Sequence, residues 1–217
     1  MIKGVKLKSE LQEQLKFLFD ASEPWGLEYN FLKIKIILKE LDTIISNKII
    51  EVENDIKGEG DVDIMRSMST QPNVFFYKND YQDTFRKALF TSLYSFFEIG
   101  LKEIISIINN IKKFGNADDV VGIGRILNTA GLIEYNNDWD NILKLASIRN
   151  VIVHHDSFVP EIEKYKNLHS CLVRNKISSI DYNGYIRITG SEFIHTSIDK
   201  FRKVYNTIYF NSEKFKS

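Results

Sequence analysis

Apolar residues recur at helical spacing along most of the chain. In the most regular stretch, from about Glu28 to Lys57, they stand three or four residues apart at Ile34, Leu38, Leu41, Ile45, Ile49, Val52 and Ile56. This spacing places them in one stripe and predicts a single long amphipathic helix. Glycines at positions 58 and 60 supply a helix-ending signal, and residues 58–73 are predicted to form a loop.

A second long helix is predicted over residues 81–113, where apolar side chains fill two adjoining stripes. One stripe consists of Phe85, Leu89, Leu93, Phe96, Gly100, Ile104, Ile107 and Ile111, and the other of Tyr94, Phe97, Leu101, Ile105 and Ile108. A helix with so wide an apolar face is expected to be buried on more than one side.

Shorter helices are predicted on either side of this pair. Ser9-Glu10-Leu11-Gln12 has the form of a capping box and precedes leucines at helical spacing. A short helix is expected near residues 120–132. Another runs from Asn137 or Asp138 to about Asp156, with apolar residues almost all round its axis. Such a helix is predicted to be central to the core or to a subunit interface.

The pattern changes after Pro160, where one short helix is followed by two alternating segments. Residues 177–182 and 185–189 flank Asn183-Gly184, a pair that strongly favours a β-hairpin. Thr189-Gly190-Ser191-Glu192 resembles a capping box and predicts a last helix over about 191–211. We therefore expect a single all-α domain over residues 1–217, an antiparallel bundle with two long helices and a small C-terminal hairpin.

Composition narrows the possible classes of protein. Twenty-nine basic residues balance twenty-nine acidic ones, which argues against a protein that coats nucleic acid through net charge. The single cysteine, Cys171, excludes an internal disulfide framework and a multi-cysteine zinc site. The apolar stretch 88–97 is too short to cross a membrane, and the N-terminus lacks an apolar signal core. We expect a cytoplasmic protein with no membrane association, metal or cofactor.

The predicted helix 137–156 carries a polar constellation in otherwise apolar surroundings. Arg149, Asn150 and His154 lie within six residues. An unpaired buried polar group destabilises the fold by roughly 1–3 kcal/mol, so these side chains are expected to have hydrogen-bond partners or a functional role. They offer a fixed cation, an amide and a group that exchanges protons near neutral pH. That combination suits an anionic substrate, most plainly a phosphodiester.

The segment Arg149-Asn150-Val151-Ile152-Val153-His154 resembles the Arg-polar-x-x-x-His signature of the HEPN superfamily (higher eukaryotes and prokaryotes nucleotide-binding). The resemblance implies a HEPN-like helical bundle and a metal-independent endoribonuclease that is dimeric through the motif helix. His154 would move the proton of the 2′-hydroxyl or of the leaving group, Arg149 would stabilise the transition state, and Asn150 would orient the phosphate. Single-stranded RNA is the expected substrate, in a toxin–antitoxin, phage-defence or stress-response role with an antitoxin or defence-system partner.

The sequence departs from the family pattern at two places. Asp156 stands where one toxin subgroup has a tyrosine that receives a nucleotide from its antitoxin, which puts that regulation in doubt. A glycine often present shortly after the motif is missing, with Ser157 and Phe158 in its place.

No nucleotide-binding loop is predicted. The segment Val121-Gly122-Ile123-Gly124 lacks the lysine of a P-loop and the third glycine of a dinucleotide fingerprint.

Other residues complete the candidate site. Glu98, amid apolar neighbours on the second long helix, is predicted to approach Arg149, in line with an acidic residue found there in other HEPN members. Its alternative is a solvent-facing glutamate. RNA phosphates are predicted to contact a basic group made up of Arg174, Lys176, Lys200, Arg202 and Lys203, although a charged outer face is the ordinary explanation.

Two other functions compete with the nuclease. The chain would act as a non-catalytic dimeric HEPN module that binds a protein partner or a nucleotide, as some family members do. Alternatively it would be a purely structural bundle, with Arg149 in an ion pair with Glu98, Asn150 in a helix–helix hydrogen bond and His154 satisfied in the core.

Overall fold

Helices dominate the computed structural model, which describes residues 2–19, 26–58, 76–159, 168, 178–181 and 183–212. The elements are α1 (Ile2–Phe19), α2 (Leu27–Gly58), a π-helical turn η2 (Phe76–Tyr81), α4 (Gln82–Ile111), α5 (Val120–Thr129), α6 (Asn137–His154), β1 (Ser178–Ile180), β2 (Ile186–Ile188) and α8 (Glu192–Asn211). The predicted all-α class with a small hairpin is confirmed. Residues 59–73 of the predicted loop and the helix expected after Pro160 lie outside the described residues, apart from Leu168.

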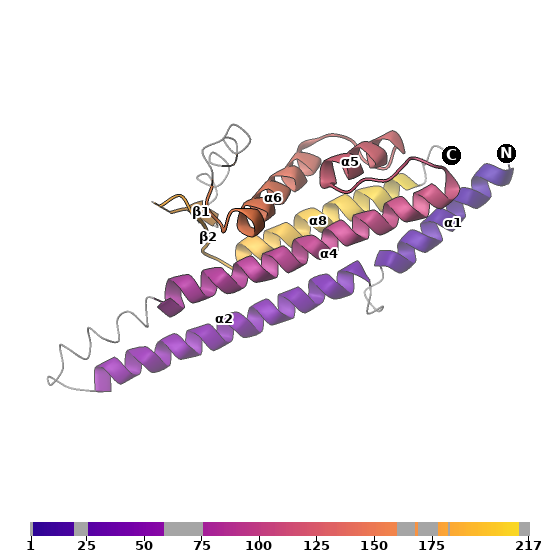
Figure 1. Cartoon of the computed structure of the whole chain (residues 1–217). Helices are drawn as coiled ribbons and strands as arrows, with labels where there is room; N and C mark the ends of the chain where they lie inside the picture. Colours follow the sequence, from indigo (N-terminus) through magenta and orange to yellow (C-terminus); the bar gives the residue numbers. More distant parts are fainter. Residues whose placement is uncertain are drawn as a thin grey trace.

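Helix α4 is the centre of the arrangement. It contacts α1, α2, α5, α6, α8 and strand β2. Figure 1 shows α2 running antiparallel to α4 along one side, with α6 and α8 on the opposite side and α1 nearly in line with α2. This central position explains the wide apolar face of α4, because neighbouring elements cover it from several directions.

The core between these helices is rich in aromatic rings. Phe97 of α4 stacks on Phe201 of α8 with ring centroids 4.1 Å apart. The hydroxyl of Tyr205 donates a hydrogen bond of 2.7 Å to the backbone oxygen of Phe97, which satisfies a polar group that is fully buried. On α2 the predicted stripe points into this core, with Leu38 and Ile45 at 0% and 1% exposed.

Several predicted boundaries differ from the structure. Helix α1 begins at Ile2, so Ser9 lies inside the helix and does not cap it. Helix α8 begins at Glu192 with Ser191 at its N-cap and no side-chain capping bond, so the capping box from Thr189 is wrong. The two errors run in opposite directions: α1 has already begun before its pattern at Ser9, whereas α8 begins only at the last residue of the pattern from Thr189.

The predicted faces of two helices also need correction. Phe85, expected in the core, is 40% exposed and packs its ring on Tyr81 at 4.7 Å. The second predicted stripe of α4 is buried throughout, together with Leu93, Gly100 and Ile104 of the first, and with Phe90, which neither stripe included. Helix α6 buries six residues from Trp139 to Val151, whereas Val153 near its end is 44% exposed. Not all of the apolar residues of α6 are therefore buried within the chain.

The β-hairpin forms with the predicted turn chemistry but shorter strands. Ser178 pairs with Ile188 and Ile180 with Ile186 in an antiparallel register. Gly184 has φ +86°, a left-handed conformation that favours glycine. The Asp181 carboxylate accepts hydrogen bonds from the backbone N–H groups of Asn183 and Tyr185, at 2.9 and 3.0 Å.

A charged network fastens the hairpin to the start of α4. Asp83, only 5% exposed, accepts a 2.7 Å hydrogen bond from the backbone N–H of Ile188. The same carboxylate pairs with Lys87 at 2.7 Å and with Arg187 at 3.3 Å. Arg187 also reaches Asp181 at 3.0 Å. A buried carboxylate is stable only when it is paired in this way, so the network fixes where β2 lies on α4.

Arg86 provides a second link in the same region. Its Nη1 donates to the backbone oxygen of Thr189 at 3.1 Å, just after β2, and its Nη2 pairs with Asp42 of α2 at 3.0 Å. The guanidinium, 6% exposed, thus ties the hairpin, α4 and α2 together.

Candidate functional site

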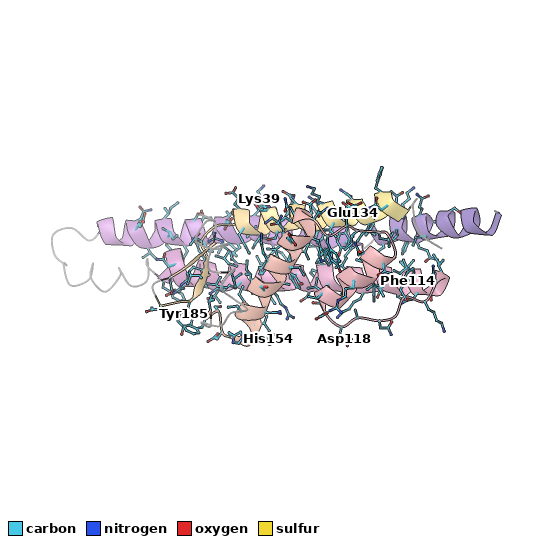
Figure 2. All side chains as sticks on the ribbon, turned by 90° about the horizontal axis from the view of Figure 1, so that it is seen from above. Lys39, Phe114, Asp118, Glu134, His154 and Tyr185 are labelled. Carbon is cyan, nitrogen blue, oxygen red and sulfur yellow. The ribbon has the colours of Figure 1, made fainter. Side chains whose placement is uncertain are left out.

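Arg149, Asn150 and His154 lie in the last two turns of α6, the helix that carries the predicted motif. The helix is capped one residue earlier than predicted, by Asn136, whose side chain accepts hydrogen bonds from the N–H groups of Asp138 and Trp139. Trp139 is 2% exposed and anchors the start of the helix. The motif residues stand at the opposite end, and in Figure 2 His154 lies at the margin of the molecule, at the foot of α6.

The Arg149 guanidinium connects the three motif side chains. Its Nη1 donates a hydrogen bond to Oδ1 of Asn150 at 3.1 Å and lies 3.5 Å from Nε2 of His154. When Nη1 donates to Nε2, that ring nitrogen is the acceptor and the neutral imidazole carries its proton on Nδ1. Arg149, Asn150 and His154 are therefore brought together, as the sequence predicts.

The three motif side chains differ in their exposure to solvent. Nε of Arg149 is buried and has no hydrogen-bond partner among the described residues. Arg149 and Asn150 are half-buried, whereas His154 is exposed. His154 is therefore not a satisfied core histidine, and its ring is accessible to a ligand that the arginine also reaches.

Tyr94 of α4 interacts electrostatically with Arg149. Tyr94 is 2% exposed, and burial together with the negative charge of Glu98 raises the pKa of its hydroxyl above the ordinary value, while Arg149 acts in the opposite direction. Tyr94 thus lies within the electrostatic reach of Arg149 and stays protonated. The helical spacing of its neighbours assigned Tyr94 to the core, and no sequence signal connected it with the motif.

Glu98 does not meet Arg149 as predicted. Its carboxylate pairs with Lys102, one turn further along α4, at 2.8 Å. The side chain of Glu98 is 22% exposed, so Lys102 reaches it from the solvent side. Among the described residues the structure therefore offers no Arg149–Glu98 ion pair, and the purely structural interpretation that rests on this pair loses its basis.

The end of α6 is held in a closed turn. The backbone oxygen of Val151 accepts hydrogen bonds from the N–H groups of both His155 and Ser157, each at 3.1 Å. Asp156 and Ser157 take left-handed conformations, with φ +48° and +69°. The backbone oxygen of Ser157 then accepts from Ile186 of β2 at 2.8 Å, so the hairpin directly supports the turn that follows His154.

The predicted basic group is not a free cationic surface where the structure describes it. Arg202 forms hydrogen bonds from Nε and Nη2 to the carboxylate of Glu28, and these raise its pKa. Lys203 pairs with Asp138 at 2.9 Å. Both cations connect α8 to neighbouring helices. Lys200 is half-buried on the same helix, and Arg174 and Lys176 lie outside the described residues.

Comparison of the chain with family models, with curated proteins and with solved structures finds no match. Among the described residues, no three His, Cys, Asp or Glu side chains gather in a way that would hold a metal ion. No described helix has the length and apolarity required to cross a membrane.

Proposed function

We propose that this protein is a HEPN-type endoribonuclease that cleaves single-stranded RNA through the 2′-hydroxyl of its substrate. The observation that carries the proposal is the contact of Arg149 with both Asn150 and His154 at the accessible end of α6. A histidine beside a guanidinium combines a proton-transfer group with a fixed cation, the two functions that cleavage of a phosphodiester requires.

The reaction follows from these groups. A neutral His154 accepts the proton of the 2′-hydroxyl through Nε2, and the 2′-oxygen attacks the adjacent phosphorus. The bond from phosphorus to the 5′-oxygen breaks, and a protonated histidine supplies that oxygen with its proton. The products are a 2′,3′-cyclic phosphate and a 5′-hydroxyl. Arg149 stabilises the negative charge that accumulates on the phosphoryl oxygens.

Among the described residues, one chain places a single histidine beside Arg149, whereas the proposed steps use a base and an acid. A homodimer that joins two α6 ends would supply both. The exposed Val153, next to His154, offers an apolar contact at this end of the helix. The setting we propose is a toxin–antitoxin, phage-defence or stress-response system with RNA as the target.

The test compares purified wild type with His154→Ala on single-stranded RNA oligomers in the presence of EDTA. We expect wild type to leave 2′,3′-cyclic phosphate ends, and the variant to be at least about 100-fold slower, the usual contribution of a general acid or base. His155→Ala is the matched control, because it changes the same residue type one position later, and it should cleave like wild type. An oligomer with 2′-deoxyribose at the cleaved positions should remain intact.

Two results would contradict the proposal: intact RNA with folded wild type, or equal cleavage by His154→Ala. Intact RNA would favour the alternative, a non-catalytic HEPN module, whose partner would then be sought by binding assays with His154→Ala as the control.

A further inference from the structure

Two aromatic side chains beside the end of α6 are open to solvent. Phe158, four residues after His154, is 41% exposed, and Tyr185 of the hairpin is 40% exposed. Their rings meet edge to face, with centroids 5.5 Å apart and an interplanar angle of 64°. We name these two residues the hairpin aromatic pair. Neither lies in a helix, so neither belongs to an apolar stripe of the bundle.

Backbone contacts hold the pair in place. Phe158 and Tyr185 face each other in an isolated antiparallel bridge. The N–H group of Val159 donates a hydrogen bond of 2.9 Å to the backbone oxygen of Gly184, next to the contact of the hairpin with Ser157. A Cβ atom at Gly184 would lie 3.0 Å from Cε2 of Phe158, so this ring rests on the turn of the hairpin. The two rings are therefore positioned before any ligand binds.

The turn after α6 keeps the pair close to His154. The N–H group of Phe158 donates a hydrogen bond of 2.8 Å to the backbone oxygen of His155. Such a bond closes a β-turn and brings its first and last Cα atoms within about 7 Å. His154 is one residue further, so its Cα atom lies within about 11 Å of that of Phe158. In Figure 2, His154 and Tyr185 lie at the same margin of the molecule.

Electrostatic attraction alone gives this chain little hold on RNA. Its formal net charge is zero. Arg202 and Lys203, two cations of the predicted basic group, are already paired with carboxylates. Proteins that bind single strands also use aromatic side chains, on which unpaired bases stack whatever their identity. Exposed rings beside the motif would supply a contact that the charges do not.

The size of the hairpin aromatic pair favours a base over a protein partner. At about 40% exposure, two side chains of roughly 150–250 Å² each present no more than about 200 Å². Each partner in a stable protein complex buries roughly 800 Å². A single base, in contrast, covers no more than the face of one ring. The pair by itself therefore matches a base and falls far short of a protein interface.

We propose that the hairpin aromatic pair is a stacking site for one unpaired base of single-stranded RNA, next to the phosphodiester that His154 acts on. The inference deepens the proposed nuclease and rests on it for the position of the cleaved bond. A base held on Phe158 or Tyr185 draws the adjoining backbone past Arg149. Because bases in a duplex are stacked on one another, this site selects unpaired strands.

Equilibrium binding tests the site without cleavage. The probe is a short, fully 2′-O-methylated RNA oligomer, which has no free 2′-hydroxyl and stays intact. In fluorescence anisotropy, Phe158→Leu and Tyr185→Leu should each raise the Kd about tenfold, because leucine keeps apolar bulk but has no ring on which a base stacks. Tyr185→Phe keeps the ring and should bind like wild type. Tyr135→Leu is the matched control: Tyr135 is 55% exposed, and its neighbour Glu134 lies away from His154 in Figure 2.

An abasic scan of the same oligomer separates stacking from a structural role. Removal of the base at one position should weaken binding to wild type about tenfold. The same removal should change binding to the Phe158→Leu/Tyr185→Leu double variant by no more than about twofold, because the rings that this base used are gone. A structural role would lower the affinity for every oligomer equally. Equal losses in both proteins at every position, or leucine variants that bind like Tyr135→Leu, would overturn the proposal.

Cleavage of unmodified RNA distinguishes this proposal from the nuclease itself. If wild type cleaves and both leucine variants bind and cleave like Tyr135→Leu, the stacking site is wrong and the nuclease stands. If the abasic scan identifies the stacked base but wild type leaves RNA intact, the nuclease is wrong and the pair remains an RNA-binding site of the non-catalytic module. Wild type that does not bind the oligomer at all would overturn the stacking site.

Discussion

Two glycines allow large side chains to approach helices more closely than a Cβ atom would permit. A Cβ at Gly124 of α5 would lie 2.5 Å from Cζ2 of Trp139. A Cβ at Gly100 of α4 would lie 2.6 Å from the hydroxyl oxygen of Tyr205. Because Trp139 anchors the start of α6, the absence of a side chain at Gly124 sets the distance between α5 and the motif helix.

We therefore expect Gly124→Ala to lower the free energy of unfolding by about 1–3 kcal/mol, as overpacking of a close contact does. Urea denaturation followed by tryptophan fluorescence measures this change. Gly190→Ala is the control, because its nearest contact would be at 3.9 Å, and it should stay within about 0.5 kcal/mol of wild type. Equal stability of the two variants would show that α5 moves easily relative to Trp139.

The motif residues could be predicted from the sequence, whereas their surroundings could not. Arg149, Asn150 and His154 are close in the chain, so one helix suffices to bring them together. The partner of Glu98 depends on how two helices rotate relative to each other, which helical spacing does not specify. Lys102, one turn away on the same helix, satisfies the carboxylate at lower conformational cost.

Ser157 takes a backbone conformation that ordinarily favours glycine. The resemblance predicts a glycine shortly after the motif, and the structure places Ser157 in a left-handed conformation, at φ +69°. Such a backbone is the reason that glycine is favoured at this kind of position.

At the scale of elements, the long helices were the most predictable parts because their stripes extend over many turns. The predicted start of α2, about Glu28, differs from the observed Leu27 by one residue. Short signals were less reliable: the turn glycine of the hairpin was right, and both capping boxes were wrong. The connection from the hairpin to α4 through Asp83 and Arg86 was not predicted, because it joins residues about a hundred positions apart.

We expect Asp83→Ala to lower the free energy of unfolding by about 3–5 kcal/mol, because it leaves a buried backbone N–H and two cations without their carboxylate. Asp80→Ala is the matched control. Asp80 also pairs with Arg187, at 3.0 Å, but its side chain is 44% exposed, so its loss should cost about 1 kcal/mol or less. Thermal or urea unfolding distinguishes the two. Similar losses for both variants would show that exposure does not decide the strength of this network.

At the scale of the whole molecule, the helices form one elongated body around α4, and its two sides carry different features (Figure 1). One side presents the end of α6 with His154, and α2 forms the other. The order of the helices along the chain predicted a bundle, but which side each element covers became clear only from the structure.

The closed turn after α6 has a consequence for the entropy of ligand binding. The last turn of a helix usually frays, and ordering it costs roughly 1–2 kcal/mol per residue of backbone. Here, Val151 holds two N–H groups and the hairpin supports Ser157, so this cost is met when the chain folds. In the proposed nuclease, a phosphate that arrives at His154 would therefore have only side-chain torsions to restrict.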